Sequence, residues 1–285
     1  MRPGLPLAAT VGRRLDDLAA TLLPPGRDGA VSVWCGSLDG VPWVARDEHA
    51  RHYAASTMKL PLLVAAYRLH ERGALDLDRP VPVHNRFASA ADGSAFALEQ
   101  DDDQDDETWA LLGSEATLRR LVRHSIVRSG NLATNLVLQR VGTAAVADVL
   151  ADAGCGPRTT LPRGIGDAVA RESGTDNLVT AHDLALVMAG VATRRLATTD
   201  TCAAVEEVVA AQEYRDKIPA GLPAGTYVAN KTGWVEGVAH DVALVRPWDA
   251  EPYVLAVCTT VDVPEDEASE VIAGISRAIW QGRMA

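Results

Sequence analysis

Segments with the composition of β-strands stand near both ends of the chain, and the long stretch between them has the pattern of helices. A lone two-stranded hairpin is only marginally stable in water. The N-terminal and C-terminal groups are therefore expected to pair into one antiparallel sheet, although most of the chain separates them. The predicted strands are residues 31–35, 42–45, 226–230, 239–245 and 253–261.

Helices are expected at both termini and through the middle, and the length of 285 residues fits one large domain or two small ones. We predict a discontinuous sheet domain formed by residues 1–55 and 213–285. Residues 56–212 form an inserted all-helical domain, and the functional cleft lies between the two, where ligand pockets tend to form. The predicted helices are residues 10–22, 57–72, 116–126, 132–141, 143–153, 180–193, 200–212 and 266–281.

The charge and composition of the chain limit the classes of molecule that it is expected to bind. Residues 99–107 contain seven acids, which account for seven of the eleven net negative charges, and runs of this kind are usually solvated. There is no basic stripe, so nucleic acid is not an expected partner, and no apolar run is long enough to span a bilayer. No signal peptide is evident at the N-terminus, which favours a cytoplasmic protein, although a trimmed secreted chain would look the same. The oligomeric state stays open.

The cysteines show neither metal-ligand spacing nor a Cys-x-x-Cys motif, so no metal and no cofactor are expected. Free, buried thiols in a reducing compartment are the favoured interpretation. The four cysteines are Cys35, Cys155, Cys202 and Cys258.

Lysine is rare in this chain: 3 of its 27 basic residues are lysine. Arginine cannot lose its proton at ordinary pH, so a retained lysine indicates a site that needs a neutral amine. Ser56 and Lys59 stand three residues apart at the start of an apolar helix, which places them on one face within hydrogen-bond reach. Free N–H groups and the helix dipole would favour an alkoxide there. The alternative is an N-cap serine followed by a surface lysine.

Two further short motifs follow. Lys231-Thr232-Gly233 stands at the end of a predicted edge strand, where it could bind a substrate carboxylate, or could be a turn with a solvated lysine. Ser129-Gly130-Asn131 connects two predicted helices and, taken alone, is typical of a turn.

The ordered set Ser-x-x-Lys, Ser-x-Asn and Lys-Thr-Gly resembles class A β-lactamases and penicillin-binding proteins. The resemblance extends from about residue 30 to residue 281. It implies an α/β (α+β sandwich) fold: a five-stranded antiparallel sheet flanked by helices, with an inserted all-helical lobe.

The resemblance also implies roles for individual residues. Ser56 would be the nucleophile, Lys59 its uncharged activator in contact with the hydroxyl, and Ser129 a proton relay tuned by Lys231. The oxyanion hole would be the backbone N–H groups of Ser56 and Trp234. Substrate contacts would come from Asn131, Thr232, Gly233 and His240.

The chain departs from the family pattern in the loop 156–177, which lacks the Glu-Pro-x-x-Asn that supplies the water-activating carboxylate of class A β-lactamases. The position of that Glu falls near Gly164. Asp167, Glu172 and Asp176 are the carboxylates at hand, and each is more typical of a surface or capping residue. Arg163 could pair with Asp176 to pin the loop. Because general-base activation contributes about 10²–10⁴-fold, acylation should survive while deacylation of a β-lactam is slow.

Two side chains near the Lys-Thr-Gly motif also differ from the pattern. His240 stands where the related enzymes often have an arginine for the substrate carboxylate, so it would bind that group well only when protonated, or act as an unusual base, or simply face the cleft. The neighbouring Asp241 should point to the other face of the strand. The indole of Trp234 would narrow the cleft or pack on the surface.

The leading hypothesis is thus a serine hydrolase that acylates Ser56 with a small-molecule or peptide substrate, an amide or ester near a carboxylate, such as a β-lactam or a D-alanyl peptide. A second hypothesis is a cytoplasmic biosynthetic hydrolase or acyltransferase of a specialised-metabolite pathway. A third is a penicillin-binding sensor that stays acylated. The lifetime of the acyl adduct discriminates among them.

Overall fold

A computed structural model describes residues 5–24 and 26–283. The predicted five-stranded antiparallel sheet is confirmed, with strand order β2-β1-β11-β10-β9. The N-terminal and C-terminal strands meet at β1 and β11, which pair along their whole length from Gly29 opposite Val261 to Ser37 opposite Tyr253. The strands of this sheet are β1 (Gly29–Ser37), β2 (Pro42–Arg46), β9 (Tyr227–Val235), β10 (Val238–Arg246) and β11 (Tyr253–Val261).

Strand β9 is longer than predicted: it ends at Val235, whereas the prediction ended at residue 230. It pairs with β10 through Val235, opposite Val238, so the Lys-Thr-Gly motif lies inside the strand and not after it. Polar residues in that stretch hid the strand from a pattern search, since they are buried by packing that the local sequence does not reveal.

The other strands are short and form two-stranded pairs. Tyr53 of one such strand pairs with Leu178, which ties the segment before Ser56 to the loop after α6 (Thr143–Ala153). The short strands are β3 (His52–Tyr53), β4 (Pro80–Pro82), β5 (Phe87–Ala88), β6 (Ala95–Phe96), β7 (Glu115–Thr117) and β8 (Leu178–Val179).

The helices agree with the predicted positions to within a few residues at most ends; the first begins earlier than predicted. Short helices that lack an apolar period, such as α3 and α7, were not predicted. The α-helices are α1 (Leu5–Leu22), α2 (Lys59–Glu71), α3 (Asp106–Trp109), α4 (Leu118–Val127), α5 (Asn131–Val141), α6 (Thr143–Ala153), α7 (Ala168–Glu172), α8 (Ala181–Ala192), α9 (Thr199–Ala210) and α10 (Glu265–Gly282). The 3-10 helices are η1 (Ala55–Met58), η2 (Gln100–Asp102) and η3 (Ile218–Gly221).

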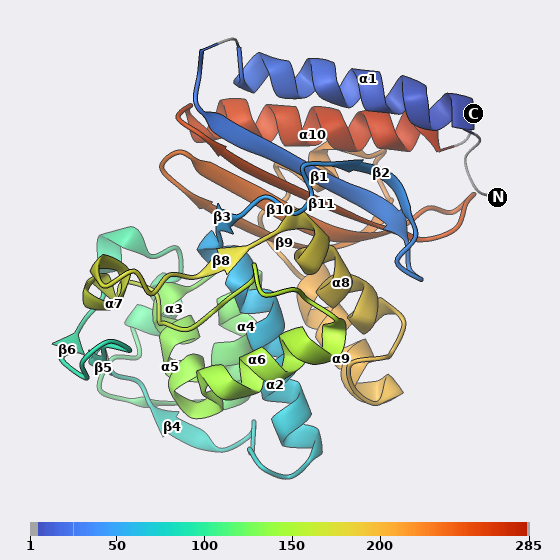
Figure 1. Cartoon of the computed structure of the whole chain (residues 1–285). Coiled ribbons are helices and arrows are strands. Elements are labelled where there is room, and N and C mark those ends of the chain that lie inside the picture. The colour runs from blue at the N-terminus through green and yellow to red at the C-terminus, as the bar shows by residue number, and fades with distance from the viewer. Residues whose placement is uncertain (1–4, 25, 284–285) are drawn as a thin grey trace.

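The elements form layers around the sheet (Figure 1). Helices α1 and α10 lie side by side on one face, where Leu15 and Ile272 pack against Val33 and Val257. Helix α8 packs on the opposite face, where Trp34 and Val242 of the sheet join the core of the helical part. The predicted boundary at residue 212 therefore assigns α8 to the helical domain although α8 also covers the sheet.

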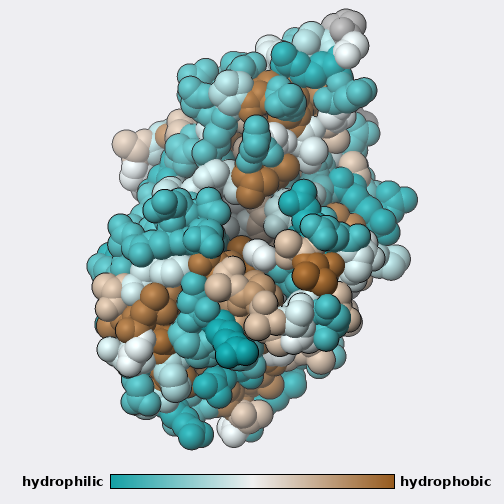
Figure 2. Space-filling view, turned by 90° about the vertical axis from the view of Figure 1, so that its left-hand side faces the viewer, coloured by the Kyte–Doolittle hydropathy of each residue, from teal (hydrophilic) through white to brown (hydrophobic). Residues whose placement is uncertain are grey.

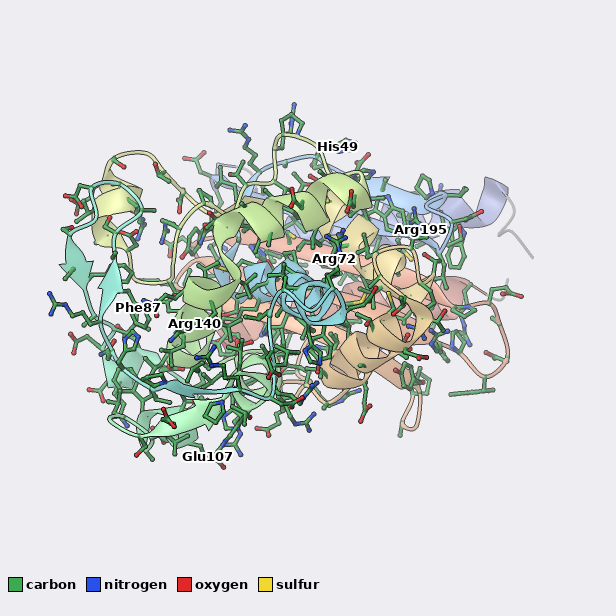
Figure 3. All side chains as sticks on the ribbon, turned by 90° about the horizontal axis from the view of Figure 1, so that it is seen from below. His49, Arg72, Phe87, Glu107, Arg140 and Arg195 are labelled. Atoms are coloured by element: carbon green, nitrogen blue, oxygen red, sulfur yellow. The ribbon has the colours of Figure 1, made fainter. Side chains whose placement is uncertain are left out.

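Helix α2 is the axis of the helical part. Viewed from below, it is seen nearly end-on in the middle, and Arg72 marks its C-terminal end, which faces the viewer (Figure 3). Ten of its residues, Lys59 to Arg68, are buried, because α4, α5, α6, α8 and α9 all pack against it. This packing fixes the position of the helix start, which carries Ser56 and Lys59.

Two further sequence expectations concern the whole chain. All four cysteines are free thiols; Cys155 is half-buried and the other three are buried. Among the described residues, no helix has both the length and the apolar character needed to cross a bilayer.

Candidate active site

Ser56 lies in η1, immediately before α2, at the edge of the sheet. The preceding Ala55 has a φ of 43°, and the hydroxyl of Thr57 donates to the carbonyl of Ala54, so the turn that carries Ser56 is tightly held. Pro61 is the third residue of α2, where its missing N–H removes no helical hydrogen bond. Ser56 is half-buried and lines a cleft, whereas Lys59 is completely buried.

The amine of Lys59 is bound by the turn between α4 and α5. Its Nζ lies 2.6 Å from the carbonyl oxygen of Ser129, 2.8 Å from Asn131 Oδ1 and 3.3 Å from Ser129 Oγ. Burial lowers the pKa of Lys59 to about 7, and the negative charges of Asp103 and Asp105 oppose that effect. Within the described residues the Ser56 hydroxyl makes no hydrogen bond to this amine, so the hydrogen bond expected from the sequence is not formed in this arrangement.

Ser129 stands between two buried amines. Its backbone has a φ of 57°, and its Oγ accepts a hydrogen bond from Lys231 Nζ at 3.1 Å. Lys231 also donates to the carbonyl of Thr232 at 2.6 Å. Burial holds the pKa of Lys231 well below its usual range, the charges of Lys59 and Lys217 lower it further, and Asp241 opposes them.

Strand β9 packs directly against η1 at Gly233. A Cβ at this position would lie 2.7 Å from the backbone nitrogen of Ser56 and 2.8 Å from that of Thr57, so only glycine allows the approach. The close packing brings Trp234 to the same cleft as Ser56, since both residues line it. These are the two residues predicted to form the oxyanion hole.

Thr232 and His240 are not where the sequence analysis expected them. Neither side chain has exposed surface, and neither residue lines the cleft. The Thr232 hydroxyl donates to the carbonyl of His240 at 3.0 Å, because alternation along β9 turns this side chain away from Lys231. A substrate carboxylate therefore cannot reach either side chain in this arrangement.

The ring of His240 is instead held by backbone groups. Its Nε2 lies 2.8 Å from the carbonyl oxygen of Tyr53, and its Nδ1 lies 2.8 Å from the carbonyl oxygen of Ala239 and 3.2 Å from the backbone nitrogen of Thr259. Burial lowers the pKa of His240 to about 4 although both carbonyls oppose that effect, so the ring is neutral at ordinary pH. The neighbouring Asp241 points to the other face, as predicted, and accepts the N–H of Ile218 at 3.0 Å.

The cleft has a volume of about 580 Å³ and is open to solvent. In Figure 2 the surface is hollowed between the upper and lower parts of the molecule, with hydrophilic side chains on both sides. Lys59, Ser129 and Lys231 lie beneath it without lining it. The lining residues are Tyr53, Ala55, Ser56, Asp101, Asp102, Gln104, Asn131, Arg163, Ile165, Gly166, Asp167, Ala168, Arg171, Trp234, Val235 and Glu236.

The loop that lacks the family's glutamate forms one wall of this cleft. Arg163 pairs with Asp176, as predicted, with 2.5 Å between Nη2 and Oδ1. Both backbone groups of Ile165 bond to the side-chain amide of Asn135, which turns the apolar Ile165 into the cleft lining.

The loop carboxylates Asp167 and Glu172 differ in position: Asp167 lines the cleft but is held by hydrogen bonds, and Glu172 is exposed. Asp167 accepts the hydroxyl of Ser89 and the N–H groups of Ala90 and Ala170, so it is a capping residue. Glu172 is exposed and is not among the lining residues of the cleft.

Trp234 both lines the cleft and packs on its neighbours. Its ring lies 4.8 Å from the ring of Tyr214, and Lys217 Nζ lies 5.2 Å from its centroid. Lys217, the third lysine, is buried and held by Asp216 at 2.8 Å and Glu265 at 2.9 Å. All three lysines are thus buried near the site, and the sequence analysis recognised the surroundings of only two.

The expectation of a solvated acidic run is wrong for Asp103 and Asp105. Asp105 has no exposed surface, and Asp103 accepts the N–H groups of Asn131 and Leu132 at 2.8 Å each. One feature of the sequence was compatible with this burial: the glycine of Ser129-Gly130-Asn131 leaves room for a side chain from another segment. The sequence around Gly130 does not identify Asp105 as that side chain.

Comparison with known proteins identifies the family to which this chain is similar. The profile of the Beta-lactamase enzyme family matches residues 13–282. The β-lactamase of Sphaerobacter thermophilus has a similar structure, with 27% identity, a TM-score of 0.78 and coverage of 95% of this chain and 96% of that one. A search of curated proteins found no match.

Two further solved structures are similar in fold. PBP-A is 21% identical with a TM-score of 0.76 over 94% of this chain and 95% of that one. An ancestral class A β-lactamase is 22% identical with a TM-score of 0.79 over 95% of this chain and 99% of that one. The sheet, the inserted helices and the family profile over nearly the whole chain agree: this protein belongs to the β-lactamase enzyme family and is a serine hydrolase.

Proposed function

We propose that this hydrolase forms an acyl-enzyme at Ser56 with amide or ester substrates, of which β-lactams and D-alanyl compounds are the first to test. The observation that carries the proposal is the position of Ser129 Oγ, 3.3 Å from Lys59 Nζ and 3.1 Å from Lys231 Nζ. Two buried amines with lowered pKa values around one hydroxyl are the arrangement that proton transfer at neutral pH requires.

Lys59 is the proposed base. A neutral amine has two N–H donors, and Lys59 has two close oxygen acceptors, the carbonyl of Ser129 and Asn131 Oδ1. Its lone pair is then left to accept a proton. Rotation about the Cα–Cβ bond of Ser56 is the motion that would bring the hydroxyl to the amine, and catalytic hydrogen bonds of this kind often tighten only when substrate is bound.

In the acylation step, Ser56 Oγ attacks the substrate carbonyl and its proton passes to Lys59. The oxyanion accepts the backbone N–H groups of Ser56 and Trp234. Ser129 then gives its proton to the leaving nitrogen or oxygen as the C–N or C–O bond breaks, and recovers one from Lys59. Asn131 and the backbone at Gly233 border the bound acyl group.

Deacylation is proposed to be slow. Ile165 presents an apolar side chain to the cleft, and the buried carboxylate of Asp167 already accepts three hydrogen bonds. No carboxylate of this loop is therefore free to activate water beside Ser56. Loss of a general base reduces a rate by about 10²–10⁴-fold.

The same feature favours a second candidate, an acyltransferase that passes the acyl group to an amine acceptor. An amine that enters the cleft needs less activation than water, so it could resolve the acyl-enzyme without a loop carboxylate. Comparing adduct lifetimes with and without added amines distinguishes transfer from hydrolysis, and a lifetime of hours under all conditions would indicate a sensor.

Intact-protein mass spectrometry tests the proposal. Incubation with benzylpenicillin or an activated D-alanyl ester should add one acyl group to the wild-type chain and none to Ser56→Ala. The proposal is overturned if no β-lactam or activated ester labels Ser56.

A further inference from the structure

The acidic segment Asp102–Asp105 wraps around the turn that carries Ser129 and Asn131. Asp103 receives the first two N–H groups of α5, from Asn131 and Leu132, one on each carboxylate oxygen at 2.8 Å. The indole of Trp109 donates to the same carboxylate at 2.8 Å and fixes its orientation. Asp103 thus acts as a capping residue supplied by a different segment of the chain.

Asp105 fills the space beside Gly130. A Cβ at Gly130 would lie 2.8 Å from the Cβ of Asp105 and 2.9 Å from its Oδ2. The backbone of Gly130 has φ −60° and ψ 126°, which any residue adopts, so this glycine is required by space and not by conformation. In class A β-lactamases the motif that corresponds to Ser129-Gly130-Asn131 is Ser-Asp-Asn. Here the middle residue has no side chain, and a carboxylate from another segment occupies its place.

The carboxylate of Asp105 is itself firmly held. It accepts the hydroxyl of Thr108, it lies 2.9 Å from His124 Nδ1, and Arg128 Nη1 lies 3.6 Å away. Its side chain has no exposed surface. The segment is also bound from its backbone, since Asn131 Nδ2 donates to the carbonyl of Asp102 at 2.9 Å.

The turn needs such support because Ser129 adopts the left-handed conformation, with a φ of 57°. A residue other than glycine persists there only when its surroundings determine it. The same turn supplies the acceptors of Lys59, the Ser129 carbonyl and Asn131 Oδ1. Whatever holds the turn therefore also holds the amine.

The two carboxylates also act on Lys59 through their charge. Asp103 and Asp105 raise the pKa of Lys59 against the effect of burial. The second buried amine, Lys231, is acted on by the charges of Lys59, Lys217 and Asp241, while His124 and Arg128 face Asp105. Removing one negative charge should lower the pKa of Lys59.

We propose that Asp103 and Asp105 are positioning residues of the active site: they hold the Ser129–Asn131 turn, which binds Lys59, in its left-handed form, and they replace the missing side chain at Gly130. The effect on acylation rests on the proposed function, while the effect on Lys59 can be measured without any substrate.

The first test is a double-mutant cycle between the two positions. Asp105→Ala should slow acylation of Ser56 by benzylpenicillin at least tenfold, and Gly130→Asp should do the same by collision with Asp105. The double variant returns a carboxylate to the vacated space and should recover to within about threefold of wild type. Additive losses in the double variant would overturn the proposal. Full labelling of Ser56 after long incubation, together with an unchanged melting profile, separates slow chemistry from misfolding.

The second test uses the scarcity of lysine. Because the chain has three lysines, ¹³Cε-lysine labelling gives three NMR signals, which Lys217→Arg and Lys231→Arg assign. Asp103→Asn should lower the titration midpoint of Lys59 by about half a unit or more, while Glu99→Gln, an exposed acid of the same run, should leave it unchanged. Equal midpoints in wild type and Asp103→Asn would overturn the proposal. A chain that gives the expected shift but never acylates would contradict the proposed function alone.

Discussion

At the scale of single residues, the chain separates two kinds of positive charge. Most basic positions are filled by the twenty-four arginines, such as the half-buried Arg246 and the exposed Arg195 (Figure 3 labels Arg195), whereas the three lysines are all buried. A buried amine can shed its proton to avoid the cost of desolvation, and a guanidinium cannot. The scarcity of lysine in the sequence therefore predicts that the retained lysines stand where arginine would not serve.

Lys59→Arg and Lys231→Arg should therefore remove activity although they conserve charge. We expect the acylation rate constant to fall by about 10³-fold or more for Lys59→Arg, because the base is then permanently protonated. Stopped-flow or quenched mass spectrometry of the Ser56 adduct measures it. Arg195→Lys, an exposed exchange, is the matched control and should react like wild type. Normal acylation by Lys59→Arg would contradict the assignment of the base.

At the scale of elements, agreement between prediction and structure depends on how local the determining contacts are. Helix 143–153 and strand 253–261 were predicted to the residue, because their own apolar pattern defines them. The course of β9 past residue 230, the burial of Thr232 and His240, and the fit of Asp105 beside Gly130 depend on contacts between distant segments. A single sequence contains no periodicity that reports such contacts.

The packing of β9 on η1 gives a prediction for Gly233→Ala. The new methyl group would lie within 2.8 Å of two backbone nitrogens, and a backbone cannot rotate away as a side chain can. The strand and the Ser56 turn must separate, which should lower the melting temperature by several degrees and acylation by at least tenfold. In Gly12→Ala, on α1, the methyl meets no atom within 4 Å, so that variant should be as stable as wild type or slightly more. Equal behaviour of the two variants would contradict the close approach.

The loop wall gives a prediction for Ile165→Glu. Asn135 holds both backbone groups of Ile165, so a glutamate there would keep the backbone in place and present a carboxylate to the cleft that contains Ser56. The lifetime of the penicilloyl adduct should shorten at least tenfold, because water gains a general base. Ile165→Gln has nearly the same shape without the charge and should retain the long lifetime. If both variants deacylate at the wild-type rate, the missing carboxylate is not what limits turnover.

At the scale of the whole molecule, two buried histidines join the sheet to the segment that leads into Ser56. His52 lies between Ser32 of β1 and Thr260 of β11, at 2.8 Å from each hydroxyl, and His240 bonds to Tyr53. The two rings lie 5.4 Å apart, edge to face. Burial lowers the pKa of His52 to about 3 and that of His240 to about 4, so the fold requires both rings to be neutral.

This requirement predicts loss of stability in mild acid. Above the pKa of about 6.5 that histidine has in unfolded chains, both states are neutral and the contribution is complete; below it only the unfolded chain takes up protons. Each histidine should then remove about 1.4 kcal/mol of stability per pH unit down to about pH 4. Asp241, whose pKa burial raises to about 6, acts in the opposite direction between about pH 4 and 6 and offsets roughly the effect of one histidine.

Urea unfolding at several pH values between 4.5 and 7.5 measures the dependence of stability on pH. His240→Gln keeps a donor for Tyr53 without a titrating ring, so it should reduce the slope by about 1.4 kcal/mol per pH unit, whereas the exposed His49→Gln should not. An unchanged slope in His240→Gln would mean that this ring is not neutral in the folded chain.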